Sequence, residues 1–136
     1  MVKSSITYEP GFRTQAIHEP SGNVILTDAP KDNNGKGEAF SPTDLVATAL
    51  GSCMCTIMGI VAERQGINLE GLKVETAKYM SSDSPRRIIK VELKIYLPIP
   101  EDHPEAKRLV AGAKGCPVHH SLHPDIETPI EWIWAK

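Results

Sequence analysis

The stretch SPTDLVATALGSC, residues 41–53, decides the fold that we expect for this chain. Ser41 is a preferred helix N-cap, Pro42 suits the first helical position, and Asp44 stands in the capping-box place. From there the pattern predicts one long helix that runs to about Gln65 and is followed by a glycine. Apolar residues lie on nearly all of its sides, which is typical of a helix in the centre of a protein.

Short β-prone runs stand on both sides of this helix. Before it we expect three strands, at residues 6–8, 12–18 and 23–27, and then a polar loop over residues 28–39. After it we expect strands at 72–80 and 87–97, helices at 104–114 and 117–122, and a last strand at 128–134. The predicted order, βββ-α-ββ-αα-β, is that of an α+β domain. One small sheet cannot cover a helix that is apolar all round, so we expect a homodimer.

Composition limits the classes of function. At 136 residues we expect one domain over residues 1–136. The net charge is −2, from 15 basic and 17 acidic residues, and no long basic run favours nucleic acid as a partner. We take no apolar stretch to be long enough to span a membrane, and the N-terminus lacks a signal-peptide core. We therefore expect a cytoplasmic protein without a membrane partner, in which paired cysteines are more often catalytic or metal-binding than structural.

Two of the three cysteines stand in informative places. Cys53 lies inside the long predicted helix, and Cys116 opens the segment CPVHHSL, residues 116–122, directly after Gly115. A thiol at a helix N-terminus meets the positive end of the helix dipole, which lowers its pKa. If the fold brings Cys53 close to Cys116, the two can form a disulfide. This pairing indicates redox chemistry rather than a structural disulfide. Cys55 faces another side of the helix and is expected to pack.

These two cysteine segments resemble the two cysteine motifs of the OsmC/Ohr superfamily, the osmotically inducible and organic-hydroperoxide-resistance proteins. The segment GINLEGLKV, residues 66–74, and the order of the elements extend the similarity over nearly the whole chain. The resemblance implies the OsmC-like fold. It also implies an intertwined homodimer, with two long central helices packed together within wrapped sheets and two active sites at the subunit interface.

The resemblance also implies an activity. In peroxidase members the cysteine that matches Cys53 attacks an organic hydroperoxide and becomes a sulfenic acid. The cysteine that matches Cys116 resolves it as a disulfide, which a dithiol such as a lipoyl group then reduces. We therefore expect a thiol-dependent peroxidase that works in oxidative-stress defence and needs no cofactor.

One position departs from the peroxidase pattern. Peroxidase members carry a Glu directly after the helix-opening proline, where it orients a catalytic Arg, and here that position is Thr43. Arg13 is the candidate partner of the Cys53 thiolate, and Glu38 could replace the missing Glu. Arg86 and Arg87, at the start of a predicted strand, are expected on the solvated surface.

Two alternatives remain open at this point. The first is a non-peroxidatic family member, a small-molecule or thiol-binding protein that keeps the two-cysteine pocket without the Arg–Glu support. The second is a zinc-binding module that uses Cys116, His119 and His123, whose spacing puts them on one helical face. Pro124 follows at once and weighs against this module, and His120 could instead modulate the pKa of a thiol.

Overall fold

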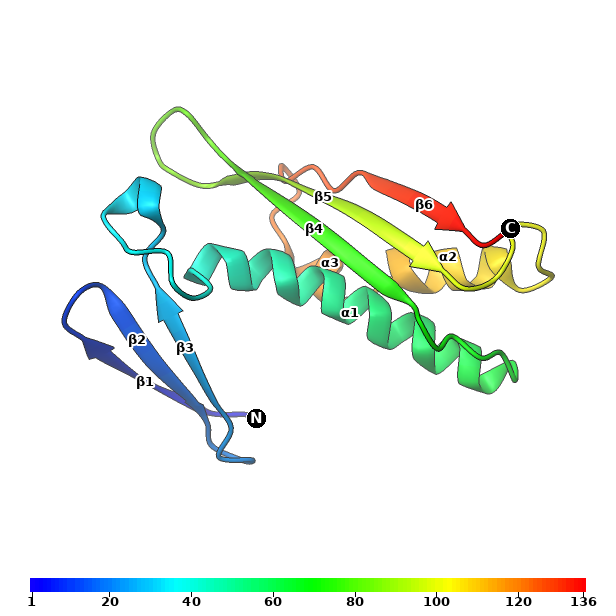
Figure 1. The fold of residues 1–136 in the computed structure, drawn as a ribbon, viewed down its shortest axis with the longest axis horizontal. Helices are drawn as coiled ribbons and strands as arrows, with labels where there is room; N and C mark the ends of the chain where they lie inside the picture. Colours follow the sequence, from blue (N-terminus) through cyan, green and yellow to red (C-terminus); the bar gives the residue numbers. More distant parts are fainter. The chain divides into compact units, whose positions relative to one another are not determined.

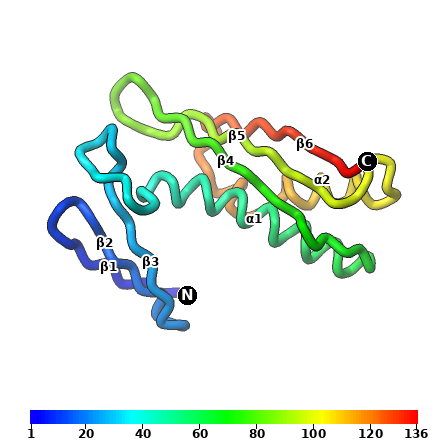
Figure 2. Tube along the Cα trace, viewed as in Figure 1, coloured from blue at the N-terminus to red at the C-terminus, as the bar shows by residue number.

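The computed structural model describes all residues, 1–136. The chain forms two compact units, Met1–Val46 and Ala47–Lys136, and each is described by itself. Figure 1 labels the elements, and Figure 2 follows the chain from one end to the other. The prediction of a single domain over residues 1–136 stays a prediction.

The first unit contains a three-stranded antiparallel sheet in the order β1-β2-β3. Its strands are β1 (Ser4–Glu9), β2 (Arg13–His18) and β3 (Val24–Asp28), as predicted within two residues at each end. The register sets Glu9 opposite Arg13, and Arg13 opposite Asp28. Two carboxylates and one guanidinium therefore share a cross-strand row at the end of this sheet.

The polar loop after β3 folds back on the end of that strand. It contains a short 3-10 helix, η1 (Lys31–Asn33), which was not predicted. The backbone N–H of Asp28 donates to the carbonyl of Phe40 at 3.0 Å, so the two ends of the loop are joined. A Cβ atom at Gly35 would lie 1.7 Å from the carbonyl oxygen of Ala29, so only glycine fits there.

The long helix α1 (Pro42–Arg64) begins at the predicted capping box. The N–H of Ser41 donates to Oδ2 of Asp44 at 2.9 Å, and the N–H of Asp44 donates to Oγ of Ser41 at 3.1 Å. These reciprocal bonds satisfy backbone donors that the helix itself cannot pair. After the helix, Gly66 adopts a φ of 69°, a left-handed conformation that ends helices. Both predicted ends are confirmed within one residue.

The second unit contains the other sheet, in the order β4-β5-β6. Strands β4 (Lys73–Met80) and β5 (Ile88–Leu97) are antiparallel, and β6 (Ile130–Trp134) pairs with β5 in parallel. Helices α2 (Ala106–Lys114) and α3 (Pro117–Ser121) form the crossover between β5 and β6. The predicted element order and the α+β class are confirmed.

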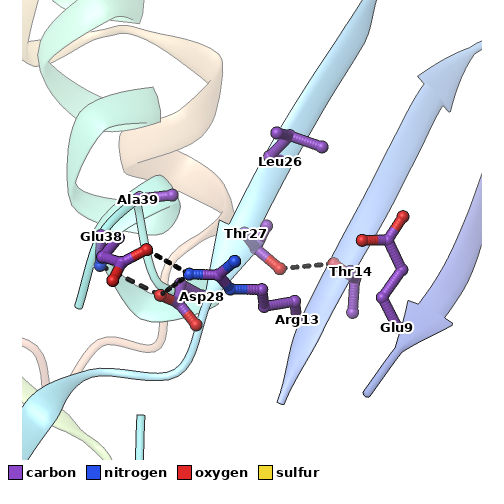
Figure 3. Close-up of a pocket in the computed structure, with 8 residues that line it drawn as sticks. All are labelled: Glu9, Arg13, Thr14, Leu26, Thr27, Asp28, Glu38 and Ala39. Atoms are coloured by element: carbon purple, nitrogen blue, oxygen red, sulfur yellow. Dashed lines mark hydrogen bonds and ion pairs between the residues drawn. The ribbon is translucent and has the colours of Figure 1, made fainter. Parts of the chain in front are cut away.

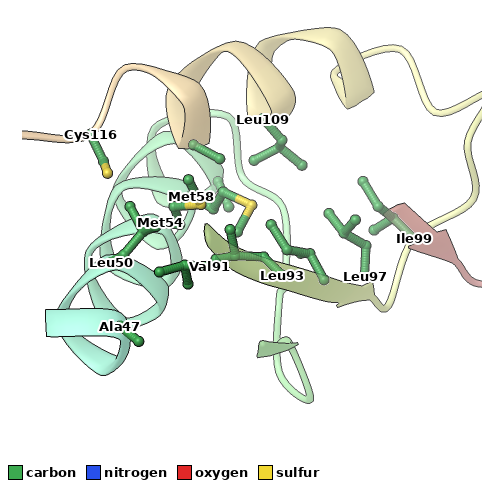
Figure 4. Packing of buried hydrophobic residues seen from close by; sticks show 13 residues of the cluster. Ala47, Leu50, Met54, Met58, Val91, Leu93, Leu97, Ile99, Leu109 and Cys116 are labelled. Carbon is green, nitrogen blue, oxygen red and sulfur yellow. The ribbon is translucent and has the colours of Figure 1, made fainter. Parts of the chain in front are cut away.

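The core of this unit lies between α1, β5 and α2 (Figure 4). The predicted alternation of β5 is confirmed, except at Ile89, which is 41% exposed. Trp132 and Trp134 of β6 pack against this core, with ring centroids 6.2 Å apart. The fully buried side chains that fill it include Leu50, Met54, Met58, Val91, Leu93, Ile95 and Leu109.

Helix α1 buries only one of its faces in the single chain. Its opposite face is exposed, and this face is formed by Thr48, Ala49, Ser52, Thr56 and Ile60. By length and composition alone α1 could cross a membrane, contrary to our expectation that no stretch reaches that length. The central helix of a soluble protein passes the same test.

Gly51 of α1 lies in tight contact with β4, so a substitution at Gly51 tests how α1 packs against this strand. A Cβ atom at Gly51 would lie 2.9 Å from Cγ2 of Thr76 and 3.2 Å from Cγ1 of Val74. In an open helix Gly→Ala stabilises by about 0.5–1 kcal/mol, but here we expect Gly51→Ala to destabilise by about 1 kcal/mol because of overpacking.

Urea unfolding followed by circular dichroism measures this change. Thr76→Ser removes the methyl group that the new Cβ would meet, so adding it should restore part of the loss. A Gly51→Ala protein that is more stable than the parent would contradict the contact.

Candidate active site

The buried thiol of Cys116 lies at the junction of α2 and α3. Gly115 ends α2, and Cys116 is the N-cap of α3, with Pro117 at the first helical position. The backbone N–H of His119 donates to Sγ of Cys116 at 3.4 Å. The thiol therefore takes the place of the usual hydroxyl or carboxylate cap.

Cys53 meets this thiol from α1. It is half-buried, packs against the core, and its side chain is close enough to interact with that of Cys116. Figure 4 shows the sulfur of Cys116 directed toward α1. Both cysteines are free thiols. The structure thus brings together the two cysteines that the sequence singled out.

Burial controls the ionisation of Cys116. It raises the pKa of this thiol above its usual value, and the interaction with Cys53 raises it further, while the N–H groups of His119 and Val118 act in the opposite direction. Our expectation that a helix N-terminus lowers this pKa is wrong. Helix α3 has only five residues, so its dipole is small, and the loss of solvation outweighs it. The environment of Cys116 therefore favours the protonated thiol.

Cys55 behaves as a packing residue. It lies two residues from Cys53 and is also a free, half-buried thiol. Burial alone raises the pKa of Cys55. Its environment therefore favours the unreactive protonated form, in agreement with the predicted packing role.

Arg13 lines a cavity of about 190 Å³ in the first unit (Figure 3). Its guanidinium forms an ion pair with the carboxylate of Glu38 and a second one with Oδ2 of Asp28, at 3.5 Å. The hydroxyls of Thr14 and Thr27 form a hydrogen bond with each other at the side of this cavity. Glu38, which we considered as a replacement for the missing Glu, does pair with Arg13.

Asp28 is the buried anchor of this cluster, at 1% exposure. The backbone N–H of Glu38 donates to Oδ2 of Asp28 at 3.0 Å. This bond, and after it the interaction with Arg13, holds the pKa of Asp28 below its usual value. Bonds to Glu38 and Asp28 in turn raise the pKa of Arg13. The cluster therefore keeps a guanidinium cation and its anionic partner at any physiological pH.

The comparison with known proteins identifies the family of this chain. The family model described as OsmC-like protein matches residues 35–131, which is more than half of the chain and includes both Cys53 and Cys116. The chain belongs to the OsmC-like family.

Solved structures share the fold over the whole chain. A proposed osmotic stress induced and detoxification response protein from Psychrobacter arcticus 273-4 is 47% identical, with a TM-score of 0.90 over 99% of this chain and 96% of that one. An organic hydroperoxide resistance protein OsmC from Legionella pneumophila is 19% identical, with a TM-score of 0.74 over 98% of this chain and 96% of that one. At this identity the Legionella protein supports the fold alone.

A curated relative matches over a shorter range. The uncharacterized protein YmaD of Bacillus subtilis (strain 168) is 31% identical over 68 residues. The match covers 49% of this chain and 45% of that protein, so it spans about half of either length.

In this OsmC-like protein Thr43 stands at the position of the motif Glu and has no carboxylate that could bind Arg13. Its hydroxyl lies 3.2 Å from the hydroxyl of Ser41, and Asp44 next to it caps the helix as predicted. The carboxylates that pair with Arg13 come instead from β3 and from the loop after it. Sequence reasoning missed Asp28, because only the strand register sets it opposite Arg13.

Arg13 and Cys53 lie in different units of the chain. Arg13 is fixed within the first unit by its own carboxylates, and Cys53 is fixed within the second by its contact with Cys116. Their pairing stays a prediction.

The histidines of the OsmC-like protein do not form the metal-ligand set of the zinc alternative. No group of three His, Cys, Asp or Glu side chains is placed to hold a metal ion. His123 pairs with Asp125 at 3.8 Å, and the ring of His119 contacts Thr128. The zinc alternative therefore lacks its ligand set, while His120 is exposed and makes an edge contact with the ring of His119.

Proposed function

We propose that this OsmC-like protein is a thiol-dependent peroxidase that reduces organic hydroperoxides in the cytoplasm and so acts in oxidative-stress defence. The observation that carries the proposal is the contact between the free thiols of Cys53 and Cys116. A half-buried thiol next to a fully buried one suits a first nucleophile and a resolving partner.

The proposed cycle has two steps on the protein. The Cys53 thiolate attacks the terminal peroxide oxygen, the O–O bond breaks, and an alcohol leaves after it takes up a proton. Cys53 is then a sulfenic acid. Cys116 attacks its sulfur, the S–O bond breaks, water leaves, and the Cys53–Cys116 disulfide remains for an external dithiol, such as a lipoyl group, to reduce.

Arg13 is the proposed partner of the Cys53 thiolate. The two carboxylates that hold it, Glu38 and Asp28, support this role because they fix its guanidinium and keep it charged. They would supply the orienting function that the motif Glu has in other members, at the position that is Thr43 here. Solved relatives named organic hydroperoxide resistance proteins share this fold and make the substrate class reasonable.

The peroxidase proposal predicts the fate of the thiols. One equivalent of cumene hydroperoxide added to the reduced protein should remove two hydrogens and link Cys53 to Cys116, as intact and peptide mass spectrometry would measure. Cys53→Ser should abolish peroxide consumption, because the nucleophile is gone, whereas Cys55→Ser should leave it unchanged.

Slow and scattered oxidation of all three cysteines would count against the peroxidase. The non-peroxidatic alternative, a small-molecule or thiol-binding protein, would then be preferred. Thr43 is the observation that keeps this alternative open.

The role of Arg13 is tested separately. Arg13→Ala should slow the formation of the Cys53 sulfenic acid at least about tenfold, because a positioned cation no longer stabilises the thiolate and the developing charge. Stopped-flow mixing with cumene hydroperoxide measures this rate. Arg86→Ala, on the hairpin between β4 and β5, is the matched control, and an equal loss in both variants would remove Arg13 from the proposed site.

A homodimer is proposed because apolar surface remains uncovered. The exposed face of α1 includes Ile60, at 41% exposure, and the first sheet exposes Ile6, Ile25 and Leu26 at 50% or more. Light scattering should give twice the chain mass of 14.9 kDa, and Ile60→Glu should shift the protein toward monomer. Lys107→Glu on α2 is the control, and a parent protein that is monomeric would contradict the dimer.

A further inference from the structure

His119 links the buried thiol to the second sheet by two hydrogen bonds. Its backbone N–H donates to Sγ of Cys116 at 3.4 Å, and its ring Nε2 lies 3.2 Å from the hydroxyl oxygen of Thr128. Thr128 stands two residues before β6, which pairs with β5 from Ile130 onward. The ring therefore joins the turn that carries Cys116 to the chain that enters the sheet.

Helix α3 needs an anchor of this kind because it is short. It has five residues, Pro117–Ser121, and none of them is fully buried. A helix of this length is not stable by itself in water. Nδ1 of His119 is enclosed without a hydrogen-bond partner, which is unfavourable, so the bond of Nε2 to Thr128 is the side-chain hydrogen bond that holds the ring.

The direction of the N–H groups in this turn matters for the thiol. The N–H groups of His119 and Val118 are the groups that favour the Cys116 thiolate against the effect of burial. They point at the sulfur only while the first turn of α3 keeps its place. Loss of the bond between His119 and Thr128 would loosen that turn without removing either N–H group.

We propose that His119 is a positioning residue for disulfide formation, which holds the Cys116 sulfur beside Cys53 by anchoring α3 to Thr128. The inference rests on the proposed function for its role in turnover. The step it assists is the attack of Cys116 on oxidised Cys53, in which the S–S bond forms, the S–O bond breaks, and the proton of Cys116 leaves in water.

The test separates disulfide closure from peroxide chemistry. In a Cys55→Ser background only two thiols remain, and diamide, which takes up their two hydrogens, closes the disulfide without peroxide. Quenching with N-ethylmaleimide and intact mass spectrometry give the rate. We expect His119→Ala and Thr128→Val to slow closure about fivefold to tenfold, the effect of one lost hydrogen bond.

Conservative variants decide whether the ring bond is the cause. The amide of His119→Gln can either donate to or accept from the hydroxyl of Thr128, and the cavity of about 390 Å³ beside His119 has room for it. Closure should therefore stay within about twofold of the parent. His120→Ala, at the exposed next position, should have no effect. Thr128→Val leaves the sequence of α3 unchanged and keeps the test valid if circular dichroism finds that His119→Ala is unfolded.

Cumene hydroperoxide provides the second readout. In His119→Ala the Cys53 sulfenic acid should form at the parent rate but accumulate, as trapping with dimedone would measure. Closure by diamide at the parent rate in both His119→Ala and Thr128→Val, or a His119→Gln protein as slow as His119→Ala, would overturn the inference. If no variant reacts with peroxide but the diamide rates differ as expected, the proposed function fails and the positioning role stands.

Discussion

The close approach of α2 to α1 is the constraint on which the thiol pair depends. A Cβ atom at Gly112 of α2 would lie 3.1 Å from Cγ2 of Val61 and 3.4 Å from Cγ2 of Ile57, so a glycine allows the two helices to pack tightly there. Cys53 lies one turn before Ile57 on α1, and Cys116 lies one turn after Gly112. The packing of α2 against α1 that buries the core side of α1 therefore also places the thiol of Cys116 beside that of Cys53.

The charged cluster of the first unit holds an arginine between carboxylates, but these carboxylates come from other positions than in the peroxidase motif. Where peroxidase motifs hold the Arg from the start of the long helix, this chain holds Arg13 from β3 and from the loop that returns to it. The bond from the Glu38 N–H to Asp28 closes that loop, and the Glu38 carboxylate then meets the guanidinium. A Thr at position 43 is compatible with this arrangement because the carboxylates come from elsewhere in the unit.

The elements could be predicted because local chemistry specifies them. Ser41, Pro42 and Asp44 fix the start of α1, and alternating apolar residues fix β5, so their ends agree with the structure. Asp28 and the ionisation of Cys116 could not be predicted in this way. The first depends on strand register, and the second depends on how deeply the thiol is buried, which is the result of packing between segments far apart in the sequence.

A buried, protonated Cys116 is compatible with a resolving role because its ionisation is linked to the state of Cys53. Burial is the largest effect that raises the pKa of Cys116, and the hydrogen bond and charge interaction with the Cys53 thiol add to it. In the proposed cycle, oxidation of Cys53 to a sulfenic acid removes this partner thiol. Of the effects on the pKa of Cys116, only burial and the N–H groups of His119 and Val118 would then remain. In the reduced protein burial, with the interaction with Cys53 added to it, favours the protonated form of Cys116. The less buried Cys53 is the proposed site of attack on the peroxide.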